Sequence, residues 1–422
     1  MSDLVYLDHN ATTPLDPRVR EAMLPWLGDR FGNPSSIHRV GQAARNAVEE
    51  AREQVAALIG ARPPEVVFTA SGTEANDTVV ASAAESARRS AAGGHLAVSA
   101  IEHPSVRQAA ARAARAGLEV TRVPPGEDGV VPAAALIGAL RPDTLLACLM
   151  LANNELGTLQ PVAAVAAECR ARGIPLLCDA VQAVGKVPVD VAGLGVDLLV
   201  LGAHKFGGPL GAAALWIRDG VEVESLLVGG SQERRRRAGT ENVAAIVGLG
   251  AAAALARDEM DGQLRPSRPL QLAALRDHFE AGLRAVPDAI VHCRTAPRLP
   301  NTSHVAFPGV EGEALLIRLD LAGFAVSTGS AFSSGTVEPS QTLLAMGLSP
   351  AEALSSIRVS FGTANHAAEV DRFLAALAGE VAALCRLTGS AMVASAAAAG
   401  ATAAGAMAAA AGALADSGAG RR

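Results

Sequence analysis

The sequence predicts an α/β fold in which a large domain with a mostly parallel sheet precedes a smaller α+β domain. The chain has 422 residues, 50% of them hydrophobic, so it can bury a large core divided between two or three domains. From about residue 35, short apolar runs alternate with segments of helical periodicity. Near-continuous apolar strands that alternate with helices indicate a parallel sheet covered on both faces.

The elements of the large domain follow from these two patterns. Ser36 can cap a helix that runs to Gly60, because apolar residues recur on one face of that segment. Further helices are expected at 104–116 and 162–172. The apolar runs that predict strands are 66–69, 96–99, 120–123, 145–151, 176–178 and 198–201. Polar motifs follow several of these runs, and such sheets bind ligands beyond the carboxyl ends of their strands.

Composition marks the ends of the domains. Asp, Gly, Arg and Pro cluster at 261–269, and the C-terminal segment is mostly Ala and Gly. We expect an N-terminal arm at 1–20 that packs with the small domain, a large domain at 21–262, a small domain at 263–388 and an Ala/Gly-rich tail at 389–422. The uncharged part of that tail is long enough to span a membrane. Alanine gains little from lipid and glycine weakens helices, so we expect a mobile or partly helical tail.

Composition also argues against several function classes. The net charge is −6 and only 3% of residues are aromatic, so neither a basic surface nor stacking platforms predict a nucleic-acid partner. The arginine run 234–237 is typical of a solvated or salt-bridged loop. Five cysteines without a CxxC pair indicate buried free thiols in a reducing compartment. The N-terminus lacks the pattern of a secretory signal, so we expect a cytoplasmic protein without a membrane partner or a metal ligand set.

Lys205 is the residue on which the functional prediction rests. It follows the buried run 198–201, precedes a Gly-Gly-Pro turn and has His204 beside it. A lysine amine forms an imine with an aldehyde once burial lowers its pKa. An aldehyde cofactor then needs a carboxylate near its pyridine nitrogen, donors for its phosphate and a flat group over its ring.

Each of these needs has a candidate in the sequence. Asp179 follows the run 176–178, with Gln182 three residues later, and His103 follows another strand. The strand-to-helix turn at 71–74 offers backbone N–H groups to a phosphate. Each candidate also has a structural explanation, because the turn is an ordinary helix cap and a single histidine is more often structural. The residues alone leave both explanations open.

Ordered motifs over nearly the whole chain resemble the cysteine desulfurase family, whose members are pyridoxal 5′-phosphate (PLP) enzymes with the class V aminotransferase fold. The similar segments are YLDHNATTP at 6–14, FGNPS at 31–35, 69–76, EH at 102–103, NNE at 153–155, DAVQ at 179–182, HK at 204–205, RAGTEN at 237–242, EPS at 338–340 and SIRVSFG at 356–362. The resemblance implies the aspartate aminotransferase-like fold (fold type I) and PLP as the cofactor.

The resemblance also implies roles for individual residues. Lys205 would hold PLP as a Schiff base and later move the Cα proton of the substrate. His103, the second catalytic residue, would stack on the pyridine ring. Asp179 would pair with the ring nitrogen, and Gln182 would reach the phenolic oxygen.

Phosphate and substrate sites are implied in the same way. The remaining cofactor-binding residues would be Ser71, Gly72, Thr73, Asn154, His204 and Thr240. Thr240 would arrive from the other subunit, which implies a homodimer. The substrate, a small amino acid, would be bound by Asn10, Asn154, Phe332 and Arg358. The planar guanidinium of Arg358 matches a carboxylate with two hydrogen bonds.

Two positions depart from the family's pattern. The family's catalytic cysteine lies in a loop that here reads STGSAFSSGTVEPS at 327–340, with Phe332 in the cysteine's place. Desulfuration needs a thiolate that accepts sulfur as a persulfide, and a phenyl ring cannot do this. Gly202 stands where the family commonly has a serine that contacts the phosphate. The loss of one such donor weakens PLP binding by about 1.5–3 kcal/mol.

The reaction predicted from these residues is C–S β-elimination from cysteine or, preferably, an S-substituted cysteine, giving a thiol, pyruvate and ammonia. Phe332 would then form an apolar wall for the substituent. One alternative is other PLP chemistry, such as decarboxylation-coupled oxidative deamination, epimerisation or transamination. Another is cysteine desulfuration, if a second cysteine swings in or Phe332 replaces a natural cysteine. A non-catalytic PLP-binding scaffold is the third.

Overall fold

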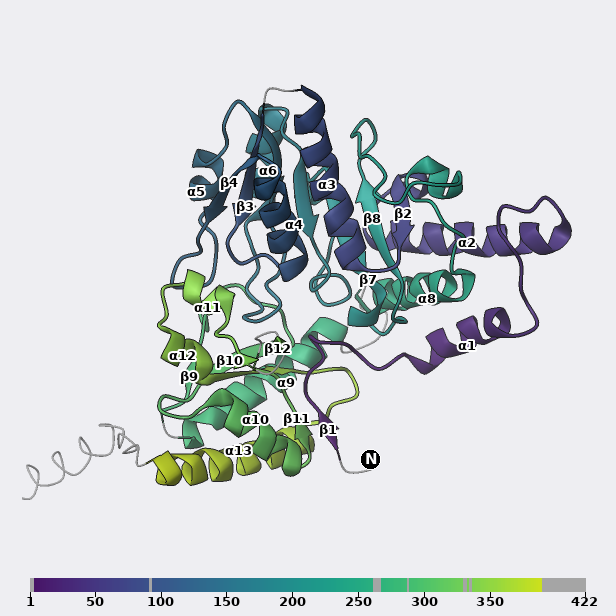
Figure 1. Cartoon of the computed structure of the whole chain (residues 1–422). Coiled ribbons are helices and arrows are strands. Elements are labelled where there is room, and N and C mark those ends of the chain that lie inside the picture. The colour runs from purple at the N-terminus through teal and green to yellow at the C-terminus, as the bar shows by residue number, and fades with distance from the viewer. Residues whose placement is uncertain are drawn as a thin grey trace, which may run out of the picture.

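The computed structural model describes residues 4–90, 93–260, 267–286, 288–328, 332–333 and 336–388 (Figure 1). Its large sheet has seven strands in the order β2-β8-β7-β6-β5-β3-β4. The strands are β2 (Val66–Thr69), β3 (His95–Ser99), β4 (Glu119–Val123), β5 (Thr144–Cys148), β6 (Leu176–Asp179), β7 (Leu198–Gly202) and β8 (Ala213–Ile217). Strand β8 runs in the direction opposite to the other six strands, and the remaining neighbouring strands pair in parallel. The predicted mostly parallel sheet is therefore confirmed.

Helices cover both faces of this sheet. The helices of the large domain are α1 (Pro17–Leu27), α2 (Arg39–Leu58), α3 (Gly72–Ser90), α4 (Pro104–Arg115), α5 (Ala133–Gly138), α6 (Val162–Ala171), α7 (Val191–Leu194) and α8 (Val243–Met260). Side chains of α3 and α4 form one apolar cluster with Leu96 and Val98, whereas α2, α6 and α8 form another with Ala97. Successive residues of β3 thus point to opposite cores, as the two-residue period of a strand requires.

The sequence pattern placed the elements of the sheet well but missed details. The helices expected at 104–116 and 162–172 are α4 and α6. The first long helix begins at Arg39, because His38 accepts from the Gly41 backbone N–H and takes the cap expected of Ser36. The run 145–151 forms a strand only as far as Cys148. Strand β8 was not predicted.

A second, smaller sheet and its helices lie beside the large domain (Figure 1). Strand β10 (Thr302–Ala306) pairs with β14 (Ser356–Ser360) and β9 (Ile290–Val291), both antiparallel. The helices here are α9 (Arg268–Gly282), α10 (Gly312–Leu321), α11 (Gln341–Ala345), α12 (Pro350–Leu354) and α13 (Ala367–Thr388). Their core is separate from the two clusters of the large sheet and contains five buried phenylalanines, Phe279, Phe307, Phe324, Phe361 and Phe373.

The N-terminal segment joins this smaller unit. Strand β1 (Val5–Tyr6) pairs in parallel with β11 (Phe324–Ala325). A two-strand hairpin, β12 (Phe332–Ser333) with β13 (Thr336–Val337), lies further along the chain. The expected domain bounds stay predictions, since 261–266 and the tail 389–422 lie outside the described residues. Within the described residues, none of the helices has the length and apolar character needed to cross a membrane.

A buried ion pair fixes the loop between β8 and α8. Glu233 accepts from Arg52 at 2.7 and 2.8 Å and from the Phe68 backbone N–H at 2.9 Å. Both side chains of the ion pair are at most 3% exposed. Glu233 and the next two residues have φ between 46° and 66°, a conformation that non-glycine residues rarely adopt. The ion pair therefore holds a strained stretch of the arginine-rich loop in place.

We expect Glu233→Ala to lower the free energy of unfolding by about 3–5 kcal/mol, because it leaves the buried Arg52 charge without its partner. Glu49 also contacts Arg52 but is 43% exposed, so Glu49→Ala should cost less than about 1 kcal/mol. Urea denaturation of the two variants measures both values. Equal losses would contradict a special role for the Glu233 pair.

Candidate active site

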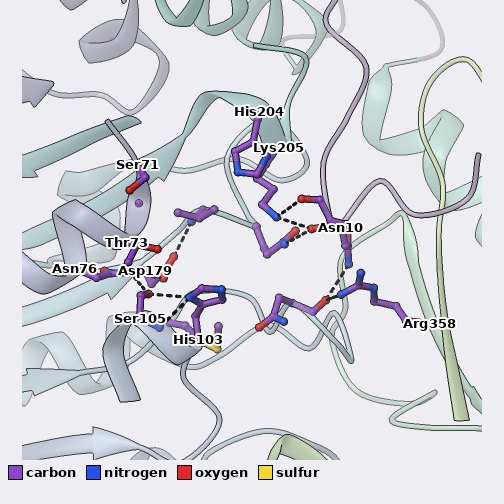
Figure 2. A pocket seen from close by; sticks show the side chains of 16 residues that line it. Asn10, Ser71, Thr73, Asn76, His103, Ser105, Asp179, His204, Lys205 and Arg358 are labelled. Atoms are coloured by element: carbon purple, nitrogen blue, oxygen red, sulfur yellow. Dashed lines mark hydrogen bonds between the residues drawn. The ribbon is translucent and has the colours of Figure 1, made fainter. Parts of the chain in front are cut away.

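A cavity of about 340 Å³ lies at the carboxyl ends of the strands of the large sheet. It brings together eleven of the predicted site residues: Asn10, Ser71, Gly72, Thr73, His103, Asn154, Asp179, Gln182, His204, Lys205 and Arg358. Figure 2 shows Asp179, Asn76 and His103 gathered on one side of this cavity, with Lys205 and His204 across from them. Five lining residues were not predicted: Ala11, Asn76, Ser105, Met150 and Val181.

Asp179, the last residue of β6, is held as a fixed acceptor. The Asn76 side chain donates to its Oδ2 at 2.7 Å, and the Val181 backbone N–H donates to its Oδ1 at 3.0 Å. Asn76 lies in the second turn of α3 and also donates to Ser105 Oγ at 3.0 Å. The motif at 69–76 was the one sequence signal that could have identified Asn76. These contacts orient a carboxylate toward any cationic ring nitrogen placed in the cavity.

His103 precedes α4 and caps it. Its Nδ1 accepts from the Ser105 backbone N–H at 3.1 Å and lies 2.8 Å from Ser105 Oγ. Burial lowers the pKa of His103, and the nearby Lys205 lowers it further, whereas Asp179 raises it. The cap and the lowered pKa favour a neutral ring held at a fixed angle. A flat neutral ring suits stacking on an aromatic cofactor.

Lys205 ends the short 3₁₀ turn that follows β7. Its amine donates to the backbone carbonyls of Asn10 at 2.6 Å and Ala11 at 2.8 Å. Burial lowers the pKa of Lys205 to about 8, with a further lowering from Arg358. Burial outweighs the attraction of Asp8 and Asp179, so roughly a tenth of the amine is uncharged and nucleophilic at pH 7.

The N-terminus of α3 forms another wall of the cavity. Ser71, Gly72 and Thr73 present the first turn of this helix, whose free N–H groups suit a phosphate. A Cβ on Gly72 would lie 3.0 Å from a methyl group of Val181, so glycine favours the close approach of α3 to the turn after β6. Gly202, where the family commonly has a serine, is less crowded than Gly72. A Cβ on Gly202 would meet nothing nearer than 3.6 Å. The missing hydroxyl therefore reflects no lack of space.

His204 and Arg358 complete the polar lining. His204 Nδ1 lies 3.2 Å from Thr12 Oγ1, and burial lowers the pKa of His204 to about 4. Arg358, in β14, donates to the Asn154 backbone carbonyl at 2.9 Å and to Asp8 Oδ1 at 2.6 Å. Its Nε is buried and has no hydrogen-bond partner among the described residues. Arg358 therefore keeps an unused donor for an acidic ligand.

Of the two remaining predicted site residues, Thr240 lies outside this cavity, and the structure does not test the place of the Phe332 side chain. Thr240 lines a separate pocket with Phe68 and Arg237. The backbone of Phe332 pairs with Val337 in the β12–β13 hairpin, and its side chain lies outside the described residues. The assignment of Phe332 as a substrate contact stays a prediction.

All five cysteines are among the described residues, and none of them lines the cavity. All five are free thiols, as expected. Four of them are buried as predicted, but Cys293 is only half-buried. Burial raises the pKa of Cys169 to about 11 and that of Cys293 to about 12. Such thiols stay protonated at neutral pH and are poor nucleophiles.

The family model described as aminotransferase class-V matches residues 5–373. The chain belongs to this family. Cysteine desulfurase IscS of Dictyoglomus turgidum is 45% identical over 359 residues, which cover 85% of this chain and 89% of the relative. Cysteine desulfurase IscS of Methanosarcina thermophila is 42% identical over 370 residues, covering 88% and 90%. The chain is thus a member of the cysteine desulfurase-like branch of PLP enzymes.

Solved structures agree with this assignment. A NifS-like protein has a TM-score of 0.83 and 34% identity, covering 90% of this chain and all of that one. A structure described as SspA in complex with cysteine has a TM-score of 0.74 and 34% identity, covering 84% and 98%. The predicted fold type I is confirmed, and so is PLP as the cofactor of the family. The buried carboxylate of Asp179, the helix N-terminus of α3 and the Lys205 amine fit that cofactor.

We expect aldehydes to add to Lys205 of the cofactor-free protein at a rate that rises with pH and levels off above about pH 8. The reason is that the pKa of this amine falls to about 8 in the folded chain, and only the uncharged amine attacks. Stopped-flow absorbance with PLP, or with pyridoxal to remove phosphate binding, measures the profile. A midpoint near that of an ordinary lysine, about 10.4, would contradict the effect of burial.

Proposed function

We propose that this enzyme uses PLP to break the C–S bond of L-cysteine or a close cysteine derivative. The observation that carries the proposal is the meeting of Lys205, Asp179 and Arg358 around one cavity. An amine for the cofactor, a carboxylate for its ring nitrogen and a guanidinium for a substrate carboxylate are the groups that amino-acid chemistry on PLP needs. PLP supplies an electron sink for the charge left when the Cα proton is removed.

The residues of the chain divide the remaining work. Arg358 binds the substrate carboxylate, and Asp8 keeps the guanidinium turned toward the cavity through its 2.6 Å contact. Lys205 accepts the Cα proton, because a pKa lowered to about 8 by burial makes the uncharged amine accessible near neutral pH. His103 and Asp179 hold the cofactor ring from its face and its nitrogen. These roles are proposals that rest on the positions of the side chains.

Cysteine desulfuration is the outcome that the relatives support, since those named cysteine desulfurase share 41–45% identity over most of the chain. In this reaction an acceptor thiolate attacks the substrate sulfur, an S–S bond forms and the C–S bond breaks. The carbon keeps the electron pair and takes up a proton, so the products are alanine and a persulfide. Because Phe332 cannot be the acceptor, we propose that a thiol from another molecule takes the sulfur.

C–S β-elimination is the second candidate, and Phe332 is the observation that favours it. Without a thiol beside the substrate, the sulfur leaves as a thiolate and the remaining carbon skeleton hydrolyses to pyruvate and ammonia. Phe332 would face an apolar substituent on the sulfur. Decarboxylation-coupled deamination would instead release CO₂ and an aldehyde.

We expect L-cysteine to yield alanine and sulfide when a small thiol such as dithiothreitol is present, and little product without it. Mass spectrometry of the products measures this. Phe332→Cys should form alanine without added thiol and carry a persulfide on the introduced cysteine, whereas the matched Phe332→Ala should still need the added thiol. If L-cysteine or an S-substituted cysteine gives pyruvate, the reaction is β-elimination and the proposal of desulfuration is wrong. No conversion of any of these substrates would favour a scaffold and overturn both.

We also propose that the enzyme works as a homodimer in the reducing cytoplasm, where its five free thiols persist. Helix α1, the following loop and the start of α2 project from the body of the large domain (Figure 1). Exposed apolar side chains gather on this projection, including Leu27 at 68%, Phe31 at 74% and Ile37 at 87%. Exposed apolar side chains of this size are typical of a protein interface. Thr240 would reach the partner's cavity from such an interface.

We expect light scattering to give twice the 42.7 kDa mass of one chain. Ile37→Asp should shift the protein toward monomers, because it places a charge in the proposed interface. Leu321→Asp is a matched control, since Leu321 is 83% exposed at the end of α10, away from this projection. If Thr240 acts across the interface, the Ile37→Asp monomer also binds PLP more weakly. A monomeric wild-type protein would rule out the shared site.

A further inference from the structure

Lys186 is one of only two lysines in the chain, the other being Lys205, although lysine and arginine together number 36. It lies in the turn after β6, and its side chain is buried, with 4% exposed. Its amine donates to Gln182 Oε1 at 2.7 Å and to Asn10 Oδ1 at 3.0 Å. No ion pair among the described residues includes Lys186, so the amine is held by amide oxygens alone.

The surroundings of Lys186 disfavour a charged amine. The titratable and charged groups that act on it or that it acts on are Lys205, Arg268, Arg358, His9 and His204. None of these is a carboxylate, and burial together with the cations lowers the pKa of Lys186 well below its ordinary value. An uncharged amine has two N–H donors, and the structure supplies two acceptors. A charged ammonium would carry a third donor.

The two contacts of Lys186 fix the direction of two side-chain amides. Because Gln182 Oε1 accepts from Lys186, its NH₂ group faces the other way and donates to the Asn10 backbone carbonyl at 2.9 Å. A flipped Gln182 would set its Oε1 against the Asn10 backbone carbonyl, acceptor against acceptor, and would remove the acceptor of one Lys186 N–H. Asn10 Oδ1 likewise accepts from Lys186, together with the Asn301 side chain at 3.1 Å, and the Asn10 NH₂ donates to Thr302 Oγ1 at 2.9 Å.

This network ends at the amine that holds the cofactor. The Asn10 backbone carbonyl accepts from Gln182 and also from Lys205, at 2.6 Å. Both Asn10 and Gln182 line the cavity, whereas Lys186 lies behind them and lines a second cavity of about 170 Å³ on the far side of Lys205. Lys186 therefore acts on the cavity through its neighbours.

We propose that Lys186 is a positioning residue that works as an uncharged double donor and fixes the direction in which the Gln182 and Asn10 amides face. Arginine cannot replace it, because a guanidinium keeps its charge in proteins and presents five donors. A chain that uses arginine almost everywhere else retains lysine where the loss of a proton is needed. The inference concerns the preorganisation of the cavity and does not depend on which C–S reaction follows.

The charge of Lys186 can be measured directly in the full-length, PLP-loaded protein. Labelling with [6-¹³C]lysine gives two signals, one for each lysine, and NMR at different pH values reports the protonation of each. We expect the Lys186 signal to be that of an uncharged amine at pH 7. A Lys186 that is charged at pH 7 and loses its proton only near 10.4 would overturn the proposal. This measurement needs no substitution, so it does not depend on the folding of a variant.

A double-mutant cycle tests whether Lys186 acts through Gln182. We expect Lys186→Met and Gln182→Leu each to raise the dissociation constant of PLP by roughly tenfold, the effect of one well-placed hydrogen bond. The double variant should be no more than about twofold weaker than Gln182→Leu, because the two residues form one unit. Independent effects that multiply, or an unchanged affinity in Lys186→Met, would contradict the positioning role.

Two further variants separate positioning from loss of a nearby charge or loss of packing. Arg268 borders the same second cavity, but its partner is Glu259 and not a cavity amide. Arg268→Met should therefore leave the PLP dissociation constant within about twofold of wild type. Lys186→Gln keeps an NH₂ donor and should restore part of the affinity lost in Lys186→Met. Equal losses in all three variants would show that only packing is at stake.

Discussion

Asn10 is the point at which the seven-stranded sheet, the three-stranded sheet and Lys205, the proposed cofactor lysine, are linked. Its backbone N–H donates to Ser360 Oγ and its side chain donates to Thr302 Oγ1, both in the smaller sheet. Its backbone carbonyl accepts from Gln182 and Lys205, which lie in the turns after β6 and β7 of the large sheet. Since every one of these groups is withdrawn from water, each must find a partner, and a misplaced Asn10 would leave several of them unpaired. The geometry of the cavity depends on this residue of the N-terminal segment.

The electrostatics of the cavity follow from the same burial. Lys205 and His204 are both withdrawn from water, and each loses affinity for its proton, with pKa values of about 8 and 4. An anionic phosphate or carboxylate that enters the cavity stabilises positive charge again, so ligand binding and protonation are coupled. Asp179 and Asp8 supply the negative charge that the structure fixes in advance, one at the end of β6 and the other beside Arg358.

The predictable part of the fold is that set by local pattern. Apolar runs located six strands of the large sheet, because buried parallel strands leave a continuous hydrophobic signal. Strand β8 (Ala213–Ile217) escaped, although Leu, Trp and Ile fill its last three positions, because it begins with two alanines directly after a glycine-rich turn. The cap of α2 was also misplaced, because the choice between Ser36 and His38 depends on which side chain reaches a free N–H in three dimensions.

The sequence by itself determined the cofactor through its resemblance to a family of PLP enzymes, and its motifs predicted eleven of the residues that line the cavity. Only the tertiary structure decided which other side chains hold the residues of the cavity in place. Asn76, which holds Asp179, and Lys186, which holds Gln182, are polar side chains whose sequence context does not reveal the contact. Their partners lie on other elements or depend on the path of a turn, and burial, which makes Lys186 an uncharged donor, exists only once the chain has folded.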